Sequence, residues 1–240
     1  MIGDPWETLL LLAKQNVILA SLTVGIFFAG VFVARRFGSH AGYSLSSLGF
    51  ARPRGGYFAG ASIGVLVGIG AVLVGVMVNA LSISVLKRFG YSTELRIQGD
   101  FMLGLEGWVR ESPGLAIPAI VLVVVLFGPA VEELAFRGGV FNGLNRLGFW
   151  IFTRSRPKES EGVIGMLPFV LAALASSVLF ALLHLEPVLL AAFVVLAFAL
   201  CALFEKTGSL LPPFVAHATF NSFAATIIIL SGLDVLPVPK

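Results

Sequence analysis

Long stretches without a charged residue dominate this chain of 240 residues. A helix needs about 20 residues to cross the hydrocarbon core of a bilayer. Six uncharged runs approach or exceed this length: Gln15–Ala34, Gly55–Leu86, Ser112–Val131, Gly162–Leu185, Pro187–Phe204 and Thr207–Leu233. Because every backbone polar group must be paired inside lipid, such runs fold as helices. We therefore predict an all-α, polytopic integral membrane bundle with six to seven transmembrane helices, or at most eight.

The composition agrees with a membrane protein and argues against several other classes. Hydrophobic residues make up 58% of the chain and charged residues 12%, about half of the ~25% charged residues found in soluble domains. The net charge of +3 comes without a basic tract, so we expect membrane lipid rather than nucleic acid as a partner. Cys201 is the only cysteine, which excludes an internal disulfide and a cysteine metal cluster.

The charge pattern divides the chain into three parts. We expect N-terminal spans and an extramembrane loop in residues 1–111, a helical core in 112–233 and a short tail in 234–240. The start of the chain lacks the pattern of a cleavable signal peptide, and Thr8–Lys14 is interpreted as a short interfacial turn. Arginine clusters after the first and third spans predict that the N-terminus lies outside the cell. The mixed-charge loop Ser82–Pro113 would also lie outside.

The third run differs from the others because it continues through two acidic residues and stays apolar to Phe152. A straight helix from Leu115 to Leu147 would be about 50 Å long at 1.5 Å per residue. Such a helix either projects beyond the bilayer or bends near Gly128–Pro129. We prefer one long helix that holds its acidic residues at mid-depth.

Three glycines of the second run, Gly60, Gly64 and Gly68, are spaced four residues apart. They share one helix face and would let another helix approach closely. We interpret this face as a packing surface rather than a functional site.

Ionisable residues inside apolar runs are candidates for function, because burying a charge is costly unless it is paired or hydrated. Glu132 and Glu133 are adjacent, so on a helix their side chains point about 100° apart. Arg137 follows Glu133 by four residues, the spacing of an ion pair on one face. Glu133 is then held by Arg137, and Glu132 is left free to face a cavity as a general base for water. The alternative is a structural charge cluster at a wetter helix end.

Two of the three histidines, His184 and His217, also lie in apolar segments, and Asn221 shares a helix face with His217. Either histidine alone would most simply be a hydrogen-bonded core residue. Together with Glu132 they supply a base, two groups able to ligate a metal or polarise a carbonyl, and an amide donor. Peptide hydrolysis by activated water requires these parts.

Three motifs in this order, EELAFR, FALLH and HATFN, resemble those of the CPBP family (CAAX protease and bacteriocin-processing), which includes the type II CAAX prenyl endopeptidases. The resemblance covers roughly Leu115 to Ser231. It implies that Glu132 activates water and that Glu133 and Arg137 support it. It further implies that His184 and His217 are catalytic and that Asn221 stabilises the oxyanion.

The resemblance also implies the activity and its setting: an intramembrane endopeptidase, multi-pass in a prokaryotic cell membrane, that acts on a lipidated or membrane-associated peptide or protein. A metal is an open question. The chain lacks an HExxH motif, and a divalent ion such as zinc would need Glu132, His184 and His217 to converge. On straight spans the two histidines would differ in depth by about 15 Å.

Two other functions remain as alternatives. The chain could be a non-catalytic membrane partner that keeps the fold, such as a bacteriocin-immunity or regulatory protein. It could also be a small transporter or channel that uses the buried polar residues as an ion path.

Overall fold

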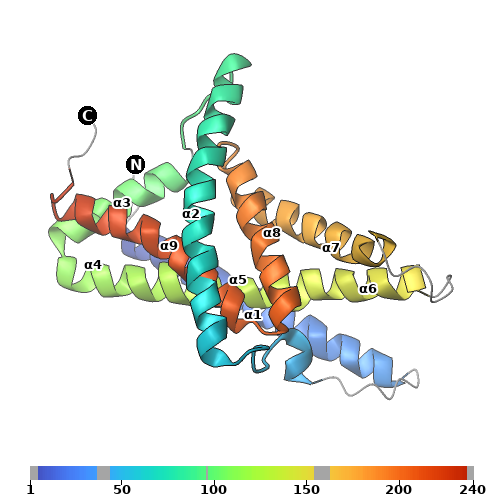
Figure 1. Ribbon diagram of the computed structural model, residues 1–240. Helices are drawn as coiled ribbons and strands as arrows, with labels where there is room; N and C mark the ends of the chain where they lie inside the picture. The colour runs from blue at the N-terminus through green and yellow to red at the C-terminus, as the bar shows by residue number, and fades with distance from the viewer. Residues whose placement is uncertain (1–4, 37–43, 96, 154–162, 237–240) are drawn as a thin grey trace.

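The computed structural model describes residues 5–36, 44–95, 97–153 and 163–236, which form helices and contain no strand (Figure 1). The α-helices are α1 (Pro5–Arg36), α2 (Tyr57–Arg88), α3 (Ile97–Glu111), α4 (Pro113–Ile120), α5 (Gly128–Glu133), α6 (Asn142–Thr153), α7 (Val163–Leu182), α8 (Leu190–Thr207) and α9 (Leu211–Gly232). A 3₁₀-helix, η1 (Leu45–Leu48), and two π-helical segments, η2 (Val121–Phe127) and η3 (Leu134–Phe141), complete the described structure.

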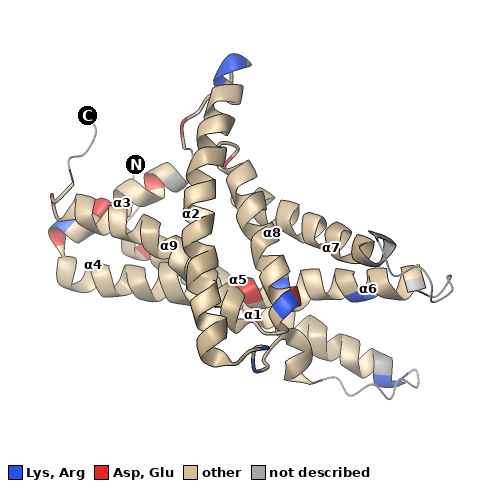
Figure 2. Cartoon of the chain, in the orientation of Figure 1, with Lys and Arg blue, Asp and Glu red and all other residues tan. Residues whose placement is uncertain are grey.

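The predicted fold class is confirmed: the chain is an all-α polytopic membrane bundle. Five helical segments in the described residues are long and apolar enough to cross a membrane: Pro5–Val33, Tyr57–Arg88, Pro113–Phe152, Leu190–Thr207 and Leu211–Gly232. Met166–Leu182 forms a sixth, shorter apolar helix. Figure 2 shows charged residues mainly at helix ends and in loops, with the acidic residues of α5 as an exception in the middle of the bundle.

The third apolar run forms one long helix, as predicted. Helical structure continues over 40 residues from Pro113 to Phe152, and α4, α5 and α6 lie along one line in Figure 1. The helix widens to π geometry in η2 and again in η3, on both sides of the two glutamates. Such π segments occur frequently at functional sites.

One expectation for the N-terminal part was wrong. Thr8–Lys14 is not a separate turn, because α1 is helical from Pro5 onward. The expected loop Ser82–Pro113 contains α3. This helix carries an apolar face, on which Leu105 and Val109 are buried in a core cluster with residues of α9.

The glycine face of α2 is a packing surface, as predicted. A Cβ atom at Gly64 would lie 2.7 Å from the carbonyl oxygen of Pro212, and one at Gly68 would lie 2.6 Å from that of Ala216. Both partners belong to α9, so α2 and α9 approach backbone to backbone. This contact fixes the helix that carries His217 and Asn221.

Candidate active site

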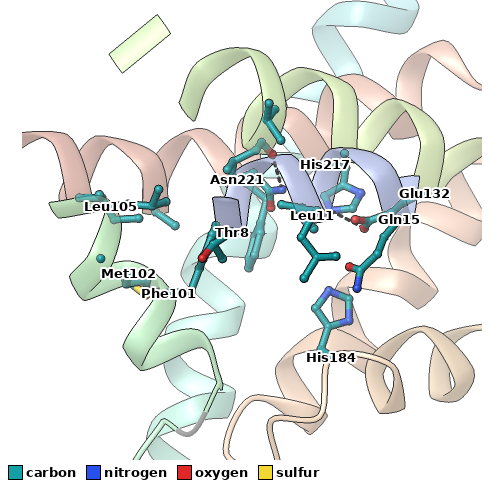
Figure 3. Close-up of a pocket in the computed structure, with 18 of the residues that line it drawn as sticks. Thr8, Leu11, Gln15, Phe101, Met102, Leu105, Glu132, His184, His217 and Asn221 are labelled. Atoms are coloured by element: carbon teal, nitrogen blue, oxygen red, sulfur yellow. Dashed lines mark hydrogen bonds and ion pairs between the residues drawn. The ribbon is translucent and has the colours of Figure 1, made fainter. Parts of the chain in front are cut away.

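One cavity of about 650 Å³ is lined by Glu132, His184, His217 and Asn221 (Figure 3). Helices α1, α3 and α9, the η2–α5 segment and the turn after α7 contribute to its wall. The structure therefore brings together four side chains from three distant stretches of sequence.

Glu133 points away from solvent into a fully buried charge cluster. Its Oε1 atom lies 3.0 Å from Nη1 of Arg137, which is the ion pair expected from their spacing. The same oxygen accepts a hydrogen bond from Nδ1 of His217 at 2.8 Å. Arg137 also donates to the carbonyl oxygen of Ala197, and its guanidinium lies 5.0 Å from the ring centre of Phe180. We call Glu133, Arg137 and His217 the buried network.

Glu132 has a different environment from its neighbour. Its side chain is 22% exposed and lines the cavity. It is not entirely free, because Oε2 lies 3.7 Å from Nε2 of His217. Since the carboxylate of Glu133 can only accept, Nδ1 of His217 carries a hydrogen, and Nε2 of the neutral ring is an acceptor that faces Glu132.

His184 is held in one orientation by its own turn. Its Nδ1 atom donates to the carbonyl oxygen of Phe180 at 2.8 Å, which leaves Nε2 of the neutral ring as an acceptor. The ring lies 4.6 Å from the ring of Phe180 and 4.5 Å from that of Phe193, measured between centroids. The next residue, Leu185, has a left-handed backbone with φ of 55°, which is rare for a bulky residue and typical of a constrained turn.

The expected difference in depth between the two histidines was wrong. Both imidazole rings lie within 6 Å of the Phe180 ring, His184 at 4.6 Å and His217 at 5.7 Å. The expectation assumed straight, parallel spans. In the structure α7 lies along α6, whereas α8 runs at a steep angle to both helices (Figure 1). Phe180 thus lies close to both histidines, which the motif alone did not indicate.

Asn221 joins α9 to the long helix. Its Nδ2 atom donates to the carbonyl oxygen of Val124 at 3.0 Å. That carbonyl lacks a helical donor, because the Gly128 N–H bonds to Val123 instead and Pro129, the next residue, has no N–H. The π segment therefore presents a backbone oxygen that Asn221 satisfies. One N–H of the amide remains for the cavity.

Comparison with protein families decides the assignment of this region. Residues 114–223 match the family model described as type II CAAX prenyl endopeptidase Rce1-like. The chain carries an Rce1-like domain. This match confirms the resemblance seen in the three motifs and supports an intramembrane protease with multiple membrane spans. No curated protein and no solved structure matches the chain significantly.

The residues that could hold a metal in the Rce1-like domain do not form a grouped ligand set. Within the residues that the structure describes, no three His, Cys, Asp or Glu side chains are placed to hold one ion. Both nitrogens of His217 face glutamates, and Nδ1 of His184 is bonded to a carbonyl. The proposed set of Glu132, His184 and His217 does not fit a metal in this arrangement, so no catalytic step is derived through one.

Part of the cavity wall comes from outside the Rce1-like domain. Thr8 and Gln15 of α1 line the cavity together with Phe101 and Met102 of α3. Gln15 was not among the predicted site residues, because in the sequence it is only the first residue of an apolar run. A usable signal was present: Thr8, Leu12 and Gln15 recur at helical spacing on one face of α1.

Proposed function

We propose that the protein hydrolyses a peptide bond in a lipidated or membrane-associated substrate, with water activated by Glu132. The observation that carries this proposal is the division of labour between two adjacent glutamates. Glu133 is fully buried against Arg137, whereas Glu132 faces the cavity beside His184 and His217. A carboxylate at the edge of a partly open cavity suits a general base.

The reaction follows from the hydrogen-bonding capacity of each group. A water proton moves to the Glu132 carboxylate while the water oxygen bonds to the carbonyl carbon, and the carbonyl electron pair moves to oxygen. His184 Nε2, an acceptor, orients the water. The second N–H of Asn221 is a donor to the oxyanion. When the tetrahedral intermediate collapses, the C–N bond breaks and the leaving nitrogen takes the proton from Glu132.

The wall of the cavity favours a substrate with a large apolar part. Beyond its polar residues, it is lined mainly by apolar side chains, such as Leu11 of α1, Phe101 of α3 and Ile228 of α9. These helices belong to a membrane bundle, so a substrate enters most readily from the bilayer. A peptide with an attached lipid or an adjacent transmembrane segment has both required properties.

The direct test is the Glu132→Gln variant, purified in detergent and offered a panel of peptides with and without an attached lipid. We expect cleavage to fall about 10²–10⁴-fold, the contribution of a positioned general base, with little change in thermal unfolding. Glu94→Gln, an exposed carboxylate in the α2–α3 connection, is the matched control and should cleave normally.

Three outcomes would contradict the proposal. Undiminished cleavage by Glu132→Gln would remove the role of Glu132. Glu132-dependent ion flux in liposomes without any cleavage would instead favour a transporter, and full biological activity of the variant would favour a non-catalytic partner.

A further inference from the structure

We propose that Gln15 of α1 is a further catalytic residue, whose side-chain amide donates a hydrogen bond to the carbonyl oxygen of the scissile peptide. The inference rests on the proposed hydrolytic function and adds a residue from outside the Rce1-like domain, which begins at residue 114. It implies that the N-terminal helix completes the active site.

The side chain of Gln15 lies in the wall of the cavity. Gln15 is exposed and lines the same cavity as Glu132 and His184. Figure 3 shows its amide end directed toward the space between these two residues. A peptide group placed there for attack by a Glu132-bound water would lie beside the amide.

Other hydrogen-bond donors around this space already have acceptors within the protein. His184 uses its Nδ1 hydrogen on the Phe180 carbonyl, and His217 uses its own on Glu133. Neutral imidazoles bonded in this way offer only an acceptor to the cavity. Asn221 has already committed one N–H to Val124. Among the described residues, Gln15 is the amide side chain of the cavity wall that makes no hydrogen bond within the protein.

The neighbouring residue, Asn16, has a different environment from that of Gln15. Asn16 is also polar, but it is buried and donates to the Leu12 carbonyl of its own helix. Polar side chains in membrane helices are costly and generally find partners. Asn16 has one inside the protein, whereas the amide of Gln15 faces the cavity.

Close contacts between glycines of the long helix and side chains of α1 hold the helix that carries Gln15 in place. A Cβ atom at Gly128 would lie 4.0 Å from Nδ2 of Asn16, and one at Gly139 would lie 3.3 Å from Cγ2 of Thr23. These contacts lie on both sides of the glutamates. A donor fixed in advance stabilises developing negative charge without reorganisation.

The test compares Gln15→Met and Gln15→Glu with the wild type on a peptide that the wild type cleaves. Methionine keeps the length and removes the donors, and glutamate keeps the shape but offers only acceptors. We expect kcat to fall about 10²–10³-fold, as for removal of one oxyanion donor, with KM changed less than about threefold. Ser21→Ala, an exposed residue of α1 that does not line the cavity, should leave both constants unchanged.

A second readout avoids turnover. A phosphinate analogue of the same peptide, which carries a tetrahedral anionic centre, should bind Gln15→Met about 10²-fold more weakly. Binding of the uncleaved peptide to Glu132→Gln should change little when Gln15→Met is added. Unchanged kcat, or a rise in KM alone, would show that Gln15 lines the cavity without acting on the scissile carbonyl, and would overturn the inference.

The two proposals fail in distinguishable ways. If Glu132→Gln is inactive and both Gln15 variants cleave normally while remaining folded, only the inference is lost. If Glu132→Gln cleaves normally, the proposed function fails and the inference fails with it.

Discussion

Glu132 and Glu133 are neighbours in sequence but lie in opposite environments. Glu133 belongs to the buried network, where its charge is balanced by Arg137 and it accepts a hydrogen bond from His217. Glu132 lies on the cavity face, defined here as Glu132, His184, Asn221 and Gln15, where several hydrogen-bonding positions remain open to a substrate. One helix thus carries a structural carboxylate and a reactive one, because adjacent residues point about 100° apart.

The difference teaches how a reactive group is held inside a membrane protein. The side chains of the buried network are shielded from solvent. Their contacts join α5, η3, α8 and α9. His217 belongs to this network through Nδ1 and reaches the cavity face through Nε2. The buried network therefore orients the cavity face, which is the arrangement that preorganised catalysis requires.

The strongest test of this comparison breaks the buried network with Arg137→Leu. Glu133 would remain buried without its cation, and its Oε2 atom already lacks a hydrogen-bond partner. Removing one partner of a buried pair costs about 3–5 kcal/mol, so we expect a large loss of stability, measured by denaturant or thermal unfolding in detergent.

The control for this variant is an ion pair at the surface. Arg110 contacts Glu106 and Asp234, and its side chain is 48% exposed. Exposed pairs contribute about 0–1 kcal/mol, so Arg110→Ala should unfold almost as the wild type does. Equal effects of the two variants would contradict the view that the buried network holds the site.

A second variant disturbs the support of α9 without touching any polar group. In Gly68→Ala the new Cβ would lie 2.6 Å from the Ala216 carbonyl oxygen, so α2 and α9 must separate and His217, the next residue, must shift. Overpacking costs about 1–3 kcal/mol, and we expect lower stability together with reduced cleavage.

Gly70→Ala is the matched control on the same helix, because nothing lies within 4 Å of its Cβ position. Alanine favours a helix over glycine by about 1 kcal/mol, so this variant should be as stable as the wild type or slightly more stable. A Gly68→Ala protein that behaves like Gly70→Ala would show that the close approach of α2 and α9 is dispensable.

Features set by local geometry could be predicted from the sequence. The apolar runs gave the helices, the four-residue spacing gave the Glu133–Arg137 pair, and the glycine spacing gave the packing face of α2. Each depends only on helix periodicity and on the energetics of groups in lipid.

Features that depend on how helices cross could not be predicted. Sequence spacing does not reveal that Phe180 lies close to both histidines, or that α1 brings Gln15 to the cavity. The proximity of His217 to Glu132, at 3.7 Å, also depends on tertiary packing. The assumption of straight spans failed for this reason.

The smallest expected effect on stability concerns Asn221, which connects the cavity face to the π segment. In Asn221→Leu the Val124 carbonyl loses its donor, but Val124 lines the cavity, where water can replace the amide. The net loss of such a hydrogen bond is about 0.5–1.5 kcal/mol, measured as a small decrease in unfolding stability. Thr226→Ala, which removes a bond within α9 only, is the control. If Asn221→Leu instead lowers the unfolding stability as much as Arg137→Leu does, then the cavity face is itself part of the scaffold. The contrast between the two glutamates is then weaker than their exposure indicates.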